Sequence, residues 1–134
     1  MKYLLALITD QSAAGERTPD QTREAMKGWD DYTNAAIAAG TYLGGEGLQP
    51  PQTATTVKLQ ESGEPIVSDG PFAETKEQLG GYYLLDCKDD EDALEWAKRI
   101  PMPGGVVEVR PVMDYEAAGS TAHRNLPEAE GARR

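Results

Sequence analysis

The chain has 134 residues, 39% of them hydrophobic and 27% charged, and a formal net charge of −10. This length suits one domain with its own core, and the composition is too apolar for a chain that is disordered throughout. An acidic protein without a basic stripe repels phosphate backbones, so we expect no direct contact with nucleic acid. The lone cysteine excludes an intrachain disulfide and is compatible with a cytoplasmic location.

The first apolar segment predicts a buried strand. Residues 3–8 are continuously apolar and end at Thr9, which is typical of a strand covered on both faces. The run is shorter than the hydrophobic region of a signal peptide, and no other stretch approaches the ~20 apolar residues of a membrane span. We therefore expect no association with a membrane.

A first helix is predicted to begin at Pro19. Thr18 suits the N-cap, Pro19 suits the first helical position, and Gln21 completes a capping box. Apolar residues then recur at steps of three and four until Gly40, which supplies a left-handed stop. The residues predicted on the buried face are Met26, Trp29, Thr33, Ala36 and Ile37.

The segment after this helix is rich in glycine and proline. The run Gly44-Gly45-Glu46-Gly47, with Pro50-Pro51 close behind it, predicts an irregular and exposed backbone. It matches neither glycine fingerprint of a nucleotide-binding loop, and the prolines prevent a helix from starting directly after it. Residues 53–60 and 65–68 then predict a β-hairpin.

The last third of the domain predicts a strand, a helix and a strand. In the strand over residues 79–86, Gly80-Gly81 indicate a bulge or a close backbone approach. Acidic residues open the second helix, where we interpret them as helix-terminal groups rather than a cation site, and the helix ends before Pro101. Residues 106–113 form the last strand. The apolar residues expected on this helix are Ala93, Leu94, Trp96, Ala97 and Ile100.

The order of elements predicts an α+β domain over residues 1–113, with the ferredoxin-like βαββαβ pattern and an inserted hairpin. Residues 114–134 lose all periodicity and predict a polar, disordered tail. A sheet with helices on one face leaves its other face uncovered, and a second copy of the chain would cover it. The residues expected on that uncovered face are Leu5, Leu7, Val107 and Val109.

A rigid turn is predicted at Asp69-Gly70-Pro71-Phe72. Pro71 fixes its own φ and keeps Gly70 out of the α region, while the Asp69 carboxylate can accept hydrogen bonds from amides just downstream. Two interpretations stay open. The turn is either structural, with Phe72 filling the core, or it is the rigid loop on which a site is built.

This turn carries a family resemblance. Together with residues 74–82, Gly44-Gly45-Glu46-Gly47-Leu48 and residues 107–111, it resembles the DGPF-motif branch of the YCII-related family over nearly the whole of residues 1–113. The resemblance implies a ferredoxin-like fold that forms a dimeric α+β barrel, sheet against sheet, without a settled activity. In the broader family a His near the first helix is paired with a carboxylate. That position is about Trp29 here, and the only histidine is His123 in the tail.

Polar and aromatic residues beside strand ends and turns predict a small-ligand pocket with aromatic walls and a few charges. An ion-pair network, for instance Lys76 with Glu46, is the alternative that stays open. Asp69 is the candidate general base. The predicted ligand-binding residues are Trp29, Tyr32, Glu46, Phe72, Lys76, Tyr82 and Arg110.

Two functions remain as hypotheses. The first is a homodimeric, cytoplasmic protein that binds an unknown small molecule, with carboxylate-assisted acid–base chemistry if it is an enzyme. The second is a regulatory or interaction module associated with transcription initiation, because proteins of the DGPF branch accompany sigma factors and an acidic protein can bind a basic partner. In both cases we expect no metal and no cofactor.

Overall fold

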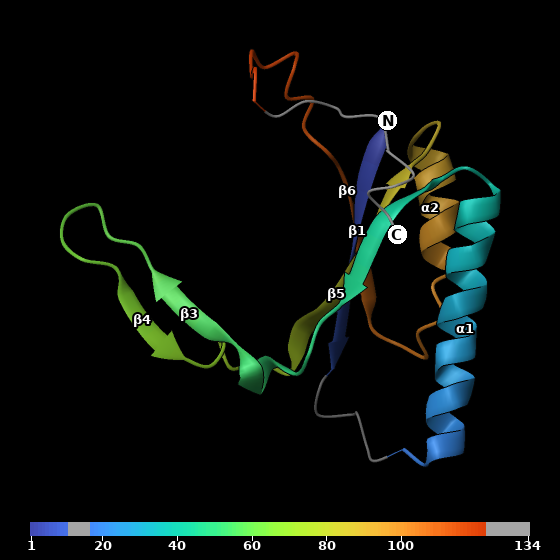
Figure 1. The fold of residues 1–134 in the computed structure, drawn as a ribbon, viewed down its shortest axis with the longest axis horizontal. Helices are drawn as coiled ribbons and strands as arrows, with labels where there is room; N and C mark the ends of the chain where they lie inside the picture. The colour runs from blue at the N-terminus through green and yellow to red at the C-terminus, as the bar shows by residue number, and fades with distance from the viewer. Residues whose placement is uncertain (11–16, 123–134) are drawn as a thin grey trace.

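The structure, a computed structural model, describes residues 1–10 and 17–122. Its main sheet has four antiparallel strands in the order β2-β5-β1-β6, and both helices cover one face of it (Figure 1). This is the predicted α+β, ferredoxin-like arrangement. The sheet strands are β1 (Lys2–Asp10), β2 (Tyr42–Gly47), β5 (Glu77–Asp86) and β6 (Val106–Pro111), and the helices are α1 (Pro19–Ala38) and α2 (Asp90–Lys98).

The first helix starts and stops where local chemistry predicts. Thr18 Oγ1 accepts a hydrogen bond from the Gln21 N–H at 3.1 Å, and Gln21 Oε1 accepts one from the Thr18 N–H at 2.9 Å. Gly40, at φ 72°, ends the helical segment. The prediction of the buried face of this helix was wrong for two residues, because the side chains of Met26 and Ile37 are more than half exposed.

The stripe of α1 that faces the sheet contains Tyr32 and Ala36. The Tyr32 hydroxyl donates to the Trp96 carbonyl of α2 at 2.8 Å, and the two rings meet edge to face at 5.7 Å. Burial raises the pKa of Tyr32 far above its usual value. This neutral phenol therefore joins the two helices over the sheet.

The hydrophobic core lies between the sheet and the helices. Tyr3, Leu5 and Leu7 of β1 belong to it, and Val107 and Val109 of β6 pack against it. The expectation that Leu5, Leu7, Val107 and Val109 line the uncovered face was therefore wrong. Every residue from 3 to 8 is apolar, so alternation alone cannot say which half of them faces the helices.

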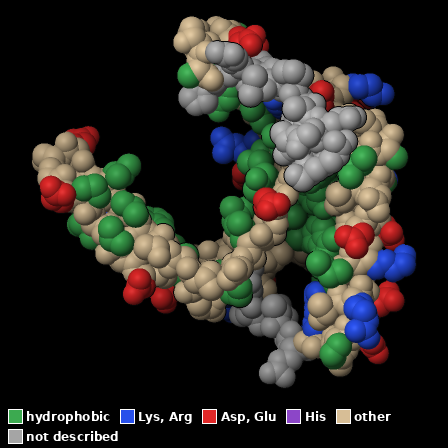
Figure 2. Space-filling model, viewed as in Figure 1, with side chains coloured by type: hydrophobic (Ala, Val, Ile, Leu, Met, Phe, Trp, Pro, Cys, Tyr) green, Lys and Arg blue, Asp and Glu red, His purple; other side chains and the backbone are tan. Residues whose placement is uncertain are grey.

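The uncovered face of the sheet has an apolar centre, and the edge strands add Glu46, Glu108 and Arg110 to it. Successive side chains of a strand point to opposite faces of the sheet. The residues of β1 and β5 that lie between the core residues, and that pair with one another across the two strands, therefore point to the open face. Figure 2 shows hydrophobic side chains along the sheet on the side of the hairpin. The apolar residues at the centre of this open face are Leu4, Ala6, Ile8, Tyr82 and Leu84.

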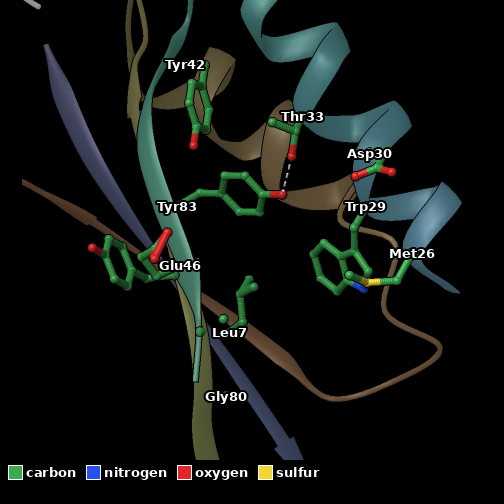
Figure 3. A pocket seen from close by; sticks show the side chains of 13 residues that line it. Leu7, Met26, Trp29, Asp30, Thr33, Tyr42, Glu46, Gly80 and Tyr83 are labelled. Carbon is green, nitrogen blue, oxygen red and sulfur yellow. Dashed lines mark hydrogen bonds between the residues drawn. The ribbon is translucent and has the colours of Figure 1, made fainter. Parts of the chain in front are cut away.

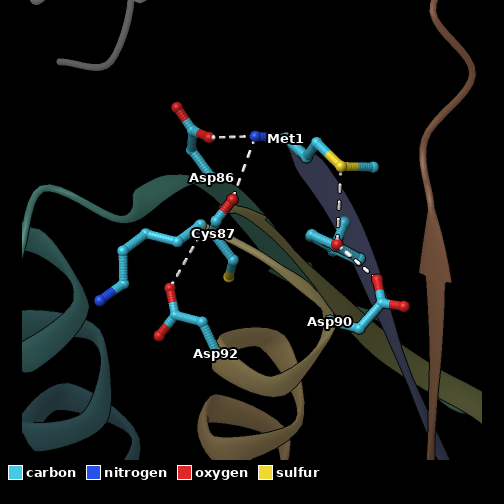
Figure 4. A network of polar contacts seen from close by, with 7 residues as sticks. Met1, Asp86, Cys87, Asp90 and Asp92 are labelled. Carbon is cyan, nitrogen blue, oxygen red and sulfur yellow. Dashed lines mark hydrogen bonds and ion pairs between the residues drawn. The ribbon is translucent and has the colours of Figure 1, made fainter.

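Polar contacts fix the start of β1 beside the connection from β5 to α2 (Figure 4). The Tyr3 hydroxyl donates to Asp90 at 2.6 Å, and this hydrogen bond raises the pKa of Tyr3 to about 12. The ammonium of Met1 donates to Asp86 Oδ1 at 3.1 Å and to the Cys87 carbonyl at 3.0 Å. Burial raises the pKa of the Cys87 thiol to about 11, so this thiol is neutral near pH 7.

The second helix begins as its acidic residues predict. Asp89 is the N-cap and accepts from the Asp92 N–H at 2.9 Å, while Asp92 accepts from the Lys88 N–H at 3.0 Å. These contacts confirm that the acidic cluster caps the helix. Ala93 and Trp96 are buried as expected, but Leu94 is half exposed, on the outer side of α2.

The inserted hairpin forms a separate two-stranded sheet. Its strands are β3 (Thr55–Lys58) and β4 (Ile66–Asp69), preceded by the 3₁₀ turn η2 (Pro51–Thr53). The hairpin extends away from the main sheet (Figure 1), and several of its apolar side chains are exposed. They are Val57, Leu59, Ile66 and Val67.

The hydrogen bonds that hold the Asp69–Phe72 turn are made by Gly70, and not by the Asp69 carboxylate as predicted. Gly70, at φ 94°, donates its N–H to the Ala54 carbonyl at 2.7 Å, and Thr56 Oγ1 donates to the Gly70 carbonyl at 2.7 Å. Among the described residues, none donates a hydrogen bond to the Asp69 carboxylate. Phe72 is 87% exposed, so the interpretation that it fills the core was wrong, because the turn lies on the hairpin and not on the main sheet.

The chain beyond β6 begins with a polar turn. Asp114 Oδ1 accepts from the Ala117 N–H at 3.1 Å, and the Asp114 carbonyl accepts from the Ala118 N–H at 3.1 Å. The rest of the predicted tail, from His123 on, lies outside the described residues. Neither described helix is long and apolar enough to cross a membrane.

Candidate functional site

A cleft of about 540 Å³ lies between α1 and the β2–β5 edge of the sheet (Figure 3). We use "the cleft" for this hollow throughout. One wall comes from α1, through Met26, Trp29, Asp30 and Thr33, and the other from β2 and β5, with Leu7 of β1 at its base. Its volume is in the range of small-molecule sites, which measure roughly 300–1,000 Å³.

Glycines on the sheet leave room for the cleft. Gly45 and Gly47 of β2 and Gly81 of β5 lie at positions on the same face of the sheet as Tyr83. A side chain at any of these positions would point toward α1. A Cβ at Gly47 would meet no atom within 4 Å, so it would stand in open space. The run Gly44–Gly47 pairs with β5 and belongs to an edge strand of the sheet. The prediction that this run is irregular was therefore wrong.

Two of these glycines also let the strands approach each other. A Cβ on Gly45 would lie 2.7 Å from the Tyr82 carbonyl oxygen, and one on Gly81 would lie 2.8 Å from the Glu46 carbonyl oxygen. The predicted bulge is present beside them. Leu7 pairs with Gly81 and Ile8 with Leu79, which leaves Gly80 as the extra residue.

Tyr83 is the centre of an aromatic cluster at the cleft. The Trp29 ring is stacked beside it, with centroids 6.3 Å apart and planes at 18°. Tyr32 and Tyr42 meet it edge to face at 5.1 and 6.2 Å. The hydroxyls of Tyr83 and Thr33 share a hydrogen bond of 2.6 Å. Burial raises the pKa of Tyr83, so its hydroxyl stays protonated at neutral pH.

Among the described residues, the charged ones that line the cleft are all negative. Asp30 and Glu46 are the acidic residues that line it, and no Lys or Arg within residues 1–10 and 17–122 does so. Glu46 pairs with Tyr82, and in Figure 3 its side chain lies on the side of β5 away from Tyr83. The carboxylate on the α1 side is thus that of Asp30, which contributes to the raised pKa of Tyr83.

A second hollow adjoins the cleft. It measures about 690 Å³ and shares Leu7, Trp29 and Gly80 with the cleft. Arg17 and Glu24 both line it, so its charges balance. Among the described residues, no group of three or more His, Cys, Asp or Glu side chains could hold a metal ion.

The structure brings together part of the predicted site. Trp29, Glu46 and Tyr82 line the cleft, although alternation directs the side chains of Glu46 and Tyr82 to the open face of the sheet, and Tyr32 lies buried behind the cleft against Tyr83. The other predicted residues do not line it. These are Asp69 and Phe72 at the hairpin, Lys76 before β5, and Arg110 on β6.

All four outlying residues are exposed, and Arg110 is on β6, at the sheet edge opposite β2. No ion pair joins Lys76 to Glu46 in the described part of the chain. A role for Asp69 as a base stays a prediction.

Sequence reasoning missed Asp30, Thr33, Tyr83 and Gly47 as cleft residues. A usable signal was present for two of them. Thr33 is one helical turn beyond Trp29, and Tyr83 alternates with Leu85 on the core side of its strand. Asp30 follows Trp29 directly, and nothing in the spacing separates it from the solvated Asp31.

Comparison with known proteins finds a matching family model and one uncharacterised relative with significant similarity. The model of the YCII-related domain family matches residues 1–116. The chain is also 34% identical, over 119 residues, to the uncharacterised protein R00369 of Rhizobium meliloti (strain 1021), and this alignment covers 87% of the chain and 95% of that protein.

Proposed function

The chain belongs to the YCII-related domain family, and we propose that it binds a small molecule in the cleft between α1 and the β2–β5 edge. The observation that carries the proposal is the glycine-lined hollow of about 540 Å³ beside an aromatic cluster. Concave sites with apolar walls and a few placed polar groups are typical of ligand binding. Here those polar groups are the hydroxyls of Thr33 and Tyr83 and the carboxylate of Asp30.

The resemblance of the Asp69–Phe72 turn supports a place in the DGPF branch of the family. Acid–base chemistry with Asp69 as the base is the finer form of the proposal, and it requires a substrate that reaches beyond the cleft to the hairpin. Neither the relatives nor the described residues favour the alternative of a module for transcription initiation.

Filling the cleft tests the proposal. Gly47→Val adds a side chain where a Cβ meets no atom within 4 Å, at a residue that lines the cleft. We expect this variant to fold normally and to lose at least about tenfold in affinity for ligands found by thermal-shift screening. Gly44→Val is the matched control, since a Cβ there also meets nothing within 4 Å and Gly44 does not line the cleft. Equal affinity in the two variants would place the ligand elsewhere.

We also propose that the protein is a homodimer whose copies meet through the open face of the sheet. The open face has an apolar centre (Leu4, Ala6, Ile8, Tyr82 and Leu84) flanked by the charged residues Glu46, Glu108 and Arg110 on the edge strands, and a sheet-to-sheet dimer would bury the apolar centre. The exposed apolar side chains of the hairpin lie on the same side of the molecule as this face (Figure 2). A second copy placed on the sheet would therefore also contact the hairpin.

The dimer predicts a twofold difference in mass by sedimentation. The wild-type chain should sediment at twice its monomer mass of 14.5 kDa at micromolar concentration. Leu84→Glu places a charge at the centre of the open face and should shift the protein toward the monomer. Leu94→Glu, at an exposed position of α2 on the other side of the sheet, is the control and should stay dimeric. A monomeric wild-type protein would refute the proposal.

A further inference from the structure

We infer that the ligand of the cleft is an organic cation, namely a protonated amine on a flat apolar or aromatic body. This inference rests on the proposed binding function and specifies its ligand class. It derives from three features of the cleft: electron-rich aromatic faces, an unpaired carboxylate, and hydroxyl oxygens beside that carboxylate.

The aromatic walls favour a cation. A positive group within about 6 Å of a Trp or Tyr ring centroid is attracted by the negative face of the ring. Trp29 and Tyr42 line the cleft with partly exposed rings, whereas the Tyr83 ring beside them is buried, its plane within 18° of that of Trp29. The two partly exposed rings provide a flat apolar surface for the body of the ligand.

Asp30 supplies the counter-charge. It lines the cleft (Figure 3), and it forms no ion pair within the described part of the chain. Its neighbours on α1 differ in this respect, because Asp31 is paired with Lys27 at 3.0 Å and Asp20 with Arg23. Asp30 thus remains available for a cation, whereas an anion in the cleft would meet this carboxylate, and none of the described Lys or Arg residues lines the cleft to balance it.

The hydroxyls complete the site for an ammonium group. Thr33 and Tyr83 share one hydrogen bond of 2.6 Å, so the oxygen of each retains acceptor capacity. An ammonium group has three N–H donors, which the Asp30 carboxylate and these oxygens can accept. The net charge of −10 also attracts cations to the protein as a whole.

Three probes of similar shape and different charge test the inference. They are 2-phenylethylamine, 2-phenylethanol and 3-phenylpropionate, added to the ¹⁵N-labelled full chain. The chain has two tryptophans, so the indole N–H signal of Trp29 reports the cleft while that of the buried Trp96 serves as an internal reference. We expect the amine to shift the Trp29 signal with an affinity at least about tenfold above that of the carboxylate.

Paired variants separate charge from shape. Asp30→Asn should reduce the affinity for 2-phenylethylamine about five- to tenfold and leave that for 2-phenylethanol unchanged. Asp31→Asn removes the same charge one residue away and should change neither affinity. If all three probes bound equally, or if Asp30→Asn left the affinity for the amine unchanged, the cleft would still be a binding site. The inference that its ligand is a cation would be overturned. No shift of Trp29 with any probe would overturn the site and the inference together.

Discussion

Replacing Gly45 by alanine is expected to lower the free energy of unfolding by about 2–3 kcal/mol. The added Cβ would lie 2.7 Å from the Tyr82 carbonyl oxygen and 3.0 Å from Cδ1 of the Tyr83 ring. The first of these atoms is backbone and cannot rotate away. The edge strand β2 must therefore shift along β5 or separate from it, and urea unfolding followed by circular dichroism measures the cost.

Two neighbouring glycines provide controls for this effect. At Gly44 and Gly47 an added Cβ meets no atom within 4 Å, so alanine at either position should change the stability by no more than about 0.5 kcal/mol. If Gly45→Ala were as stable as these two variants, the close approach of β2 to β5 would be wrong. The floor of the cleft would then need another explanation.

The sequence was sufficient wherever structure depends on neighbouring residues. The capping box of Thr18 and Gln21, the Gly40 stop and the acidic start of the second helix are local hydrogen-bond and backbone effects, and each is found where it was predicted. The bulge at Gly80 belongs to the same class. These signals also fix the order of the elements, and the order is enough to predict the ferredoxin-like fold.

The predictions failed where the answer depends on distant residues. Gly44–Gly47 is irregular by composition, yet pairing with β5 makes it a strand. The apolar run of β1 has no polar alternation, so its two faces could be told apart only once α1 and α2 were in place. Tertiary packing decides both cases.

Only part of the candidate site could be predicted from the sequence, because tertiary packing also decides which residues line the cleft. Trp29 and Tyr82 were identified because aromatic residues are common in ligand sites. Asp69 and Phe72 were linked to the site by their distinctive turn, but the hairpin carries that turn away from the cleft (Figure 1). Tyr83 was missed because a tyrosine within an apolar strand is indistinguishable from an ordinary core residue.

Tyr83→Ala is expected to cost about 3–5 kcal/mol of folding stability, because it removes the ring that Trp29, Tyr32 and Tyr42 all contact. Tyr83→Phe keeps those ring contacts and removes only the hydrogen bond of 2.6 Å to Thr33. This conservative variant should lose about 1 kcal/mol. Urea unfolding of the two variants beside the wild type measures both values.

The conservative variant also separates the structural role of Tyr83 from its role in binding. If the hydroxyl only ties α1 to the sheet, Tyr83→Phe should bind 2-phenylethylamine as tightly as the wild type. If the hydroxyl oxygen accepts from the ammonium, as we infer, the affinity should fall about three- to tenfold while that for 2-phenylethanol falls less, because hydrogen bonds to charged groups are the stronger ones. An equal loss for both probes would assign Tyr83 to the shape of the cleft and not to recognition of charge.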